Sequence, residues 1–183
     1  LAVTTAVTRA GMARKQTLGI AEPNHGARGW RNVAANTGVA ACAGLVGAYP
    51  AARDIACLVV ASALTTAAAD SVASEIGKAW GRSTWSITSL SRVPPGTSGA
   101  MSLEGTVAGI VGALGLGAAG VWLGLVPSTM LVAIVVGATA GSLLESWLGA
   151  TLESPGILNN DMLNFINTAT ATFVTLAVAS WSG

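Results

Sequence analysis

A long segment without charged residues constrains this chain more than any other feature. No Asp, Glu, Lys or Arg occurs between Glu104 and Glu145, and this segment is about twice as long as the ~20 residues that a helix needs to cross a bilayer. Pro127 and Ser128 lie near its middle, where proline favours a turn. The segment therefore predicts two membrane-spanning helices joined by a tight turn.

The rest of the sequence has the same character. Charged residues make up only 9% of the chain, whereas soluble domains contain about 25%. Apolar segments recur at residues 33–49, 55–77, 102–124, 129–151 and 161–181. No change in composition marks a soluble domain. The sequence therefore predicts a single all-α, polytopic helical membrane domain over residues 1–183, with about five transmembrane helices in this chain.

The basic residues are distributed unevenly. All nine Lys and Arg residues lie at or before Arg92. If five spans alternate in direction, every basic residue except Arg53 lies on the side of the longer loops. Cytoplasmic loops carry the excess of Lys and Arg, so the longer loops are expected in the cytoplasm or in the chloroplast stroma. Because these residues fall between apolar segments, they do not form the basic surface of a nucleic-acid-binding protein.

Two polar stripes end the second apolar segment. Asp70 and Ser74 share one helical face, and Ser71, Glu75 and Lys78 share the adjoining one. In one interpretation Glu75 pairs with Lys78 at a helix end, and Asp70 hydrogen-bonds to a neighbouring helix. In the other, the carboxylates form a metal or proton-transfer site and bind Mg²⁺ together with substrate phosphates. Charged groups inside a membrane are costly, which favours a functional role.

The loop that follows has the sequence SRVPPGTSGAMSLEG. Gly96, Thr97 and Gly99 offer backbone N–H groups and a hydroxyl, Arg92 lies beside them, and Glu104 falls on the opening turn of the next helix. Such a loop can hold phosphates. Taken alone, an ordinary interhelical turn is the simpler explanation.

Glu145 is a further acid inside an apolar segment. It shares a helical stripe with Gly141 and Gly149, and small residues allow a neighbouring helix to approach closely. Glu145 is therefore expected to face that neighbour and not lipid. It is either a structural buried carboxyl group or part of the same site as Asp70.

Asparagine is concentrated at the start of the last apolar segment. Asn160, Asn164 and Asn167 recur at helical spacing, with Asp161 alongside and Asn159 before them. An N-terminal cap accounts for Asn159 or Asn160. The others either bind hydroxyl, phosphate or base groups, or form an amide ladder that holds helices together.

Four motifs together resemble one known family. In chain order they are D-S-V-A-S-E-I-G-K-x-x-G, V-P-P-G-T-S-G-A-x-S-L-E-G-T-x-A-G, E-S-x-L-G-A and L-N-N-D-x-x-N-x-I-N. This order and spacing resembles the phytyl-phosphate kinase family, an integral membrane group that includes transmembrane protein 19. The fourth motif is most similar to cyanobacterial and plastid members. The family normally has one or more helices before this region, so the resemblance implies that such helices are missing here.

The resemblance implies a phosphotransferase. A phosphoryl group would pass from a nucleoside triphosphate, CTP, to phytyl phosphate, and the phytyl diphosphate would serve tocopherol and phylloquinone synthesis. The partners would be the lipid bilayer, the isoprenoid phosphate and the nucleotide, with Mg²⁺ as cofactor. The location would be the thylakoid or inner envelope of a plastid, or a cyanobacterial membrane.

The motifs also assign candidate residues by resemblance. The catalytic carboxylates would be Asp70, Glu75, Glu104, Glu145 and Asp161, and the metal ligands among them Asp70, Glu75 and Glu145. The substrate- and phosphate-binding residues would be Ser74, Lys78, Arg92, Gly96, Thr97, Gly99, Asn160 and Asn164.

Two other classes of function compete with the kinase. A non-catalytic scaffold subunit of a larger membrane complex, such as a photosynthetic one, fits a small chain rich in Ala and Gly. An ion or proton transporter fits less well, because the charged residues are expected at one membrane face and a transport pathway needs them along its length.

Overall fold

The computed structural model describes residues 2–22, 29–153 and 155–181. Within them the chain forms α1 (Ala2–Arg9), α2 (Met12–Thr17), α3 (Trp30–Val46), α4 (Arg53–Trp80), α5 (Leu103–Trp122), α6 (Leu131–Leu148) and α7 (Asn160–Trp181). The five long helices, α3 to α7, correspond to the five apolar segments, which confirms the predicted helical membrane fold.

Four of these helical segments are long and apolar enough to cross a bilayer. Among the described residues they are Pro50–Trp80, Leu103–Trp122, Ser128–Glu153 and Asn160–Trp181. The remaining long helix, α3, has 17 residues, slightly fewer than the ~20 of a typical span. The observed number is thus roughly that predicted from the sequence.

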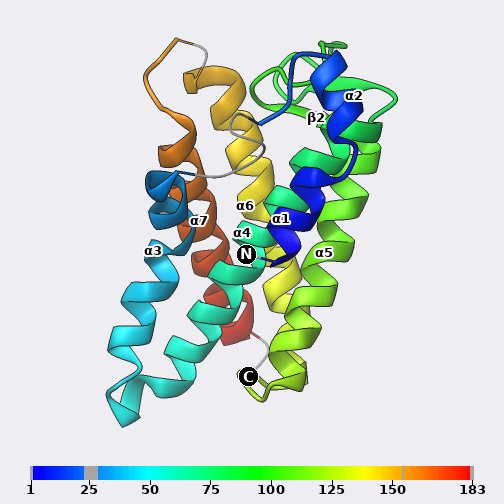
Figure 1. The fold of residues 1–183 in the computed structure, drawn as a ribbon. Helices are drawn as coiled ribbons and strands as arrows, with labels where there is room; N and C mark the ends of the chain where they lie inside the picture. Colours follow the sequence, from blue (N-terminus) through cyan, green and yellow to red (C-terminus); the bar gives the residue numbers. More distant parts are fainter. Residues whose placement is uncertain (1, 23–28, 154, 182–183) are drawn as a thin grey trace.

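Helix α4 lies at the centre of the bundle and contacts α3, α5, α6, α7 and α1 (Figure 1). Glycines bring its neighbours close. A Cβ atom on Gly105 of α5 would lie 2.6 Å from the Ala73 carbonyl oxygen of α4, and one on Gly109 would lie 2.9 Å from the Ala73 Cβ atom. Gly137 and Gly141 of α6 pack in the same manner on α7. The glycine-rich composition therefore serves close helix contact, as expected for packing in lipid.

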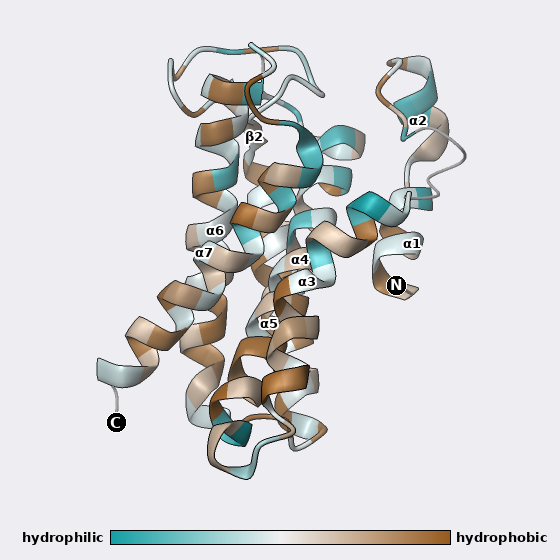
Figure 2. Ribbon diagram, turned by 90° about the vertical axis from the view of Figure 1, so that its left-hand side faces the viewer, coloured by the Kyte–Doolittle hydropathy of each residue, from teal (hydrophilic) through white to brown (hydrophobic). Residues whose placement is uncertain are grey.

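The two ends of the bundle differ in polarity. Helix α2, strand β2 (Ala100–Ser102) and the connection between α6 and α7 lie at one end, and the short turns before α4 and before α6 lie at the other (Figure 1). Hydrophilic residues gather toward the first end, whereas the remainder is mostly hydrophobic apart from the turns (Figure 2). The longer loops thus share one side, as the alternation of spans predicted.

One part of the polar loop is not helical. Strand β1 (Thr84–Ser86) pairs antiparallel with β2 (Ala100–Ser102), and Trp85 lies opposite Met101. Ser102 ends this hairpin and begins α5, because its side-chain oxygen accepts a hydrogen bond from the Gly105 N–H at 3.1 Å. Among the described residues this small sheet departs from the all-α prediction, and it fixes where the loop joins α5.

The N-terminal helices lie against α4. The turn between α1 and α2 contains Gly11, whose φ of +65° is in the left-handed region. A Cβ atom there would lie 2.6 Å from the Ala79 Cβ atom. Glycine at this position therefore allows α1 and α2 to lie directly on the polar half of α4.

Candidate functional site

A pocket of about 570 Å³ opens between α4, α5, α6 and α7, and the loop at 96–99 lies over it. We call it the site pocket. Its lining mixes small and aliphatic side chains with charges, amides and hydroxyls, most of them from the helices, and the loop at 96–99 adds backbone groups and hydroxyls. The candidate residues that line it are Asp70, Ser74, Lys78, Gly96, Thr97, Gly99, Glu145, Asn160, Asp161 and Asn164. Four sequence motifs far apart in the chain therefore meet at one place.

Carboxylates dominate the charge of the site pocket. Its described lining contains Glu22, Asp70, Glu145, Glu153 and Asp161, against the single ammonium group of Lys78. With all these groups ionised, the formal charge is −4. A phosphate compound is itself strongly anionic, so it would meet a field of the same sign unless cations entered with it.

Two carboxyl groups meet inside the pocket. Asp70 of α4 and Glu145 of α6 interact directly through their side chains. Asn167 of α7 donates a hydrogen bond from Nδ2 to Oε2 of Glu145. This amide links α6 to α7, as the amide-ladder interpretation proposed, and it also fixes the orientation of Glu145. Glu145 is therefore held toward Asp70 and not toward lipid.

The oxygen of the same amide has no partner. Asn167 is 1% exposed, and its Oδ1 atom makes no hydrogen bond in the described structure. A Cβ atom on Gly141 would overlap this oxygen, so glycine is needed for Asn167 to lie here. A buried acceptor without a donor is costly, so this oxygen is a weak point in the contact between α6 and α7.

The glycine-rich loop covers the same pocket. Gly96, Thr97, Ser98 and Gly99 all line it. Gly99 has a φ of +71°, and a Cβ atom on it would overlap the backbone at the end of α6. The loop is thus pressed onto α6, and its position favours the phosphate interpretation over that of a simple turn.

The end of α6 has an unusual backbone. Residues Gly149–Glu153 form a π-helical turn, a feature often found at functional sites. This turn directs Glu153 to the pocket, where it acts on the charge of Glu145. Sequence analysis did not select Glu153, because helical periodicity alone gives no sign of a π turn.

Helix α7 begins beside the pocket. Asn159 caps it, since its Oδ1 accepts a hydrogen bond from the Met162 N–H at 3.0 Å, which confirms the capping prediction. Asn160, Asp161 and Asn164 follow on the pocket side. Asn164 donates from Nδ2 to the Asn160 carbonyl oxygen at 2.7 Å, which steadies its side chain at the rim.

Three candidate residues lie outside the lining. Arg92 stacks over the ring of Trp85, 5.3 Å from its centroid. Glu104 lies 4.0 Å from the Arg82 guanidinium. Glu75 is fully buried on the other side of α4. The structure therefore does not bring these three together with Asp70 and Glu145, and the predicted three-carboxylate metal set is separated.

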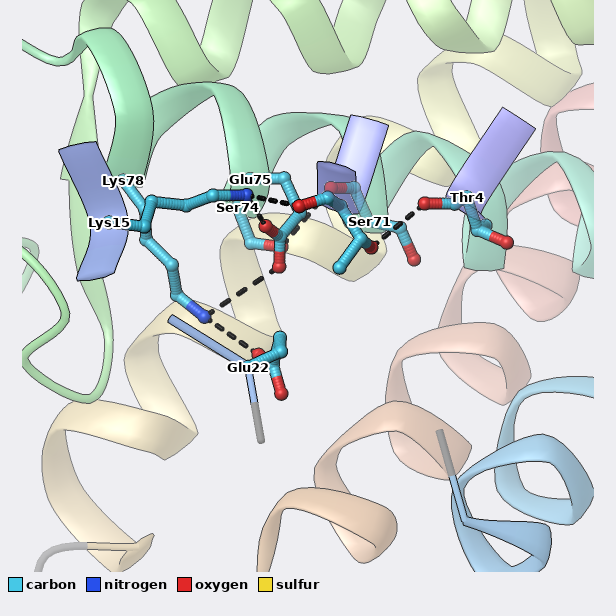
Figure 3. Close-up of polar contacts among 8 residues, drawn as sticks. Thr4, Lys15, Glu22, Ser71, Ser74, Glu75 and Lys78 are labelled. Atoms are coloured by element: carbon cyan, nitrogen blue, oxygen red, sulfur yellow. Dashed lines mark hydrogen bonds and ion pairs between the residues drawn. The ribbon is translucent and has the colours of Figure 1, made fainter. Parts of the chain in front are cut away.

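Glu75 instead joins α4 to the N-terminal helices (Figure 3). It forms an ion pair with Lys15 of α2, and both side chains are 0% exposed. Lys15 also donates to the Thr8 carbonyl oxygen at 2.6 Å. Lys78 lies 3.9 Å from Glu75 and 2.9 Å from Glu22, so the Glu75–Lys78 pairing was predicted in part, whereas Lys15 was missed.

Further residues that line the site pocket were not among the predicted site residues. Glu22 follows α2 and reaches the pocket through its pair with Lys78. Thr106, Ser142 and Ser146 add hydroxyl groups from α5 and α6. Ser142 and Ser146 are four residues apart on α6; the sequence places them next to the stripe of Glu145, but they were not among the predicted site residues.

Comparison with known proteins identifies the family. Residues 1–172 match the family model described as integral membrane protein DUF92. The chain belongs to this family. It is therefore an integral membrane protein, as its composition predicted.

Relatives extend from cyanobacteria to plants and archaea. The chain is 41% identical over 170 residues to the uncharacterized membrane protein sll0875 of Synechocystis sp.. It is 35% identical over 179 residues to Protein VTE6, chloroplastic, of Arabidopsis thaliana, and 36% identical over 107 residues to the uncharacterized membrane protein MJ0933 of Methanocaldococcus jannaschii. The cyanobacterial and chloroplastic relatives confirm the family that the four motifs indicated.

These alignments cover most of the chain but only part of the relatives. They include 91%, 94% and 58% of the chain and 66%, 54% and 44% of the respective relatives. The chain thus spans between about half and two thirds of the length of the first two. No solved structure matches it.

Proposed function

We propose that this chain forms the catalytic part of a Mg²⁺-dependent phosphotransferase that makes phytyl diphosphate from phytyl phosphate, with CTP as the phosphoryl donor. The observation that carries the proposal is an amphipathic pocket, open at the polar end of a membrane bundle, whose described lining holds five carboxyl groups and one ammonium group. Phosphates enter such a pocket only together with multivalent cations. The family resemblance supplies the isoprenoid and the nucleotide.

The residues present suit Mg²⁺. This ion is commonly held by one or two carboxylates together with substrate phosphates and water. Asp70 and Glu145 both line the pocket and interact through their side chains. Within the described part of the chain no group of three or more His, Cys, Asp or Glu residues forms a metal cage. We therefore assign the ion to Asp70 and Glu145, and we leave Glu75 out of the set. When bound, Mg²⁺ would neutralise phosphate charge in the transition state.

The phosphoryl transfer requires little covalent chemistry from the protein. An oxygen of phytyl phosphate forms a bond to the γ-phosphorus of CTP, and the bond from that phosphorus to the β–γ bridging oxygen breaks, so that CDP leaves. A phosphate monoester has its second pKa near ~6, so the attacking oxygen is already an anion at neutral pH. A general base is not required, which is consistent with carboxylates that bind cations instead.

The other lining residues would position the two phosphates. Lys78 offers the ammonium group of the described lining, and the loop from Gly96 to Gly99 offers backbone N–H groups. Asn160 and Asn164 offer amides from the opposite wall. Positioning and charge neutralisation account for most of the rate in phosphoryl transfer, so this arrangement supports the proposed chemistry.

The test is phosphoryl transfer from labelled CTP to phytyl phosphate by the purified protein in detergent. Asp70→Asn and Glu145→Gln are each expected to lower the rate about a hundredfold or more, since each weakens a metal site worth several kcal/mol. Asp54→Asn is the matched control, because Asp54 is an exposed acid at the other end of the same helix. Its rate should equal that of the parent protein.

A second readout does not depend on catalysis. Mn²⁺, followed by electron paramagnetic resonance, should bind the parent protein and Asp54→Asn but not the two pocket variants. If a well-folded, monodisperse parent protein makes no product and binds no Mn²⁺, the phosphotransferase proposal fails. The scaffold subunit of a larger membrane complex would then be the better explanation.

A further inference from the structure

The site pocket ends on a floor of three alanines. Ala69 of α4, Ala113 of α5 and Ala138 of α6 pack together below the polar rim, and all three line the pocket. Ala113 lies ~16 Å along α5 from its N-cap residue Ser102, at 1.5 Å per residue. The pocket therefore stops partway across the bundle and cannot hold a long hydrocarbon chain stretched toward the other end.

Two of the pocket's walls are closed. Gly105 and Gly109 of α5 press against Ala73 of α4, so no chain passes between α4 and α5. Gly137 and Gly141 of α6 lie equally close to α7. The wall toward α3 is polar, since Asn32, Asn160 and Asn164 line it.

The wall between α5 and α6 is different. Below the floor the two helices are in close contact, and a Cβ atom on Gly117 would lie 2.7 Å from the Leu131 Cδ1 atom. Above the floor both helices line the pocket, which separates them. Ile110 of α5 and Leu143 of α6 line it as apolar residues at this seam. Leu143 is also 42% exposed, and it shares a helical stripe with Val136 and Trp147, which are exposed and do not line the pocket. A side chain that lines a pocket and faces the membrane marks a lateral opening.

We propose that the hydrocarbon tail of the substrate leaves the site pocket between α5 and α6, over Ile110 and Leu143, and continues into the bilayer. This inference rests on the proposed function for the identity of the substrate. The phosphate would lie among the polar groups at the rim, and the alanine floor would turn the tail outward. The opening suits a single flexible chain of any length beyond the seam, so the site selects for a lipid phosphate and sets no upper limit on its length.

The test compares substrates that do and do not reach the seam. Dimethylallyl phosphate, with five carbons, stays inside the pocket, whereas phytyl phosphate, with twenty, has to pass it. Ile110→Trp and Leu143→Trp should each raise the KM for phytyl phosphate about tenfold or more, as expected when an apolar contact is blocked. The KM for CTP and the turnover of dimethylallyl phosphate should stay unchanged. Val111→Trp is the control, because Val111 is exposed on α5 and is not part of the lining.

An equal effect on both substrates, or none on phytyl phosphate, would overturn the lateral opening while leaving the phosphotransferase intact.

A second measurement decides the matter if the parent protein transfers no phosphate. Phytyl phosphate with a diazirine at its tail would be photolysed on the protein and the labelled peptides mapped by mass spectrometry. Labels on the facing sides of α5 and α6 support the opening independently of catalysis. Labels on α3 and α7, or evenly over the whole surface, refute it.

Discussion

The buried pair of Lys15 and Glu75 makes the sharpest prediction about stability. Both side chains are 0% exposed, and apart from this pair the nearest opposite charge to Glu75 is the Lys78 ammonium at 3.9 Å. Lys15→Met would leave the Glu75 carboxylate buried with that distant partner. Breaking a buried pair from one side costs about 3–5 kcal/mol. At about 1.4 kcal/mol per tenfold, the population in which α1 and α2 leave α4 should rise by two to four orders of magnitude.

The double variant separates charge from packing. In Lys15→Met/Glu75→Gln neither side chain carries a charge, and replacing both members of a buried pair is often nearly neutral. The population of the double variant in which α1 and α2 leave α4 should therefore return to within about tenfold of that of the parent protein. Arg14→Met is the control, because Arg14 is exposed in the same helical turn and its removal takes away the same charge without uncovering a buried partner.

Cysteine alkylation measures this opening. Thr8 of α1 is 2% exposed, so a Thr8→Cys probe should react with maleimide only when the N-terminal helices leave α4. The free cysteines Cys42 and Cys57 are first replaced by serine. When closing is fast relative to labelling, the labelling rate follows the open population. The reasoning is refuted if Lys15→Met labels as slowly as the parent, or if the double variant labels as fast as Lys15→Met.

Other predictions concern the glycines and the facing carboxylates. In a thermal unfolding assay, Gly141→Ala should destabilise the protein by about 1–3 kcal/mol, because its Cβ atom overlaps Asn167 of α7. Gly115→Ala, whose Cβ atom would have nothing within 4 Å, should be neutral or stabilising in the same assay. Gly99→Ala and Gly124→Ala share φ values of +71° and +70°, so both carry about 1–2 kcal/mol of backbone strain. Only Gly99→Ala also presses on α6 and should raise the KM for CTP; equal effects of the two would contradict this. Glu145→Gln should raise the unfolding temperature in EDTA, since it removes one of two adjacent carboxylates, and should abolish stabilisation by Mg²⁺. A variant that Mg²⁺ still stabilises would count against the assigned ligands.

The helices could be predicted because their apolar segments are long. The apolar segment at 102–124 corresponds to α5 (Leu103–Trp122), and the apolar segment at 161–181 corresponds to α7 (Asn160–Trp181). The β-hairpin could not be predicted, because its strands have three residues each, too few to show an alternating pattern. The connections were located correctly, but their internal geometry was not.

The site was predicted where one helix alone determines it. Periodicity gave two adjoining stripes on α4, one with Asp70 and Ser74 and one with Ser71 and Glu75. It could not show which stripe faces the pocket, because that depends on what covers the other. Lys15, sixty positions earlier in the chain than Glu75, covers the stripe that contains Glu75. Lys15 lies on a short helix, and no local sequence pattern predicts that this helix packs against α4.

The placement of the basic residues explains why the pocket stays acidic. Glu75 is neutralised by Lys15, and Glu104 lies near Arg82, so these two acids outside the pocket have basic partners within the protein. Glu145 receives an uncharged amide instead, and no basic side chain of the described residues forms an ion pair with it. The basic residues of the described ranges thus leave this carboxyl group beside Asp70 without an ion-pair partner. Two adjacent carboxyl groups are unfavourable until a cation joins them, so the energy lost in the empty pocket is recovered when metal and phosphate bind together.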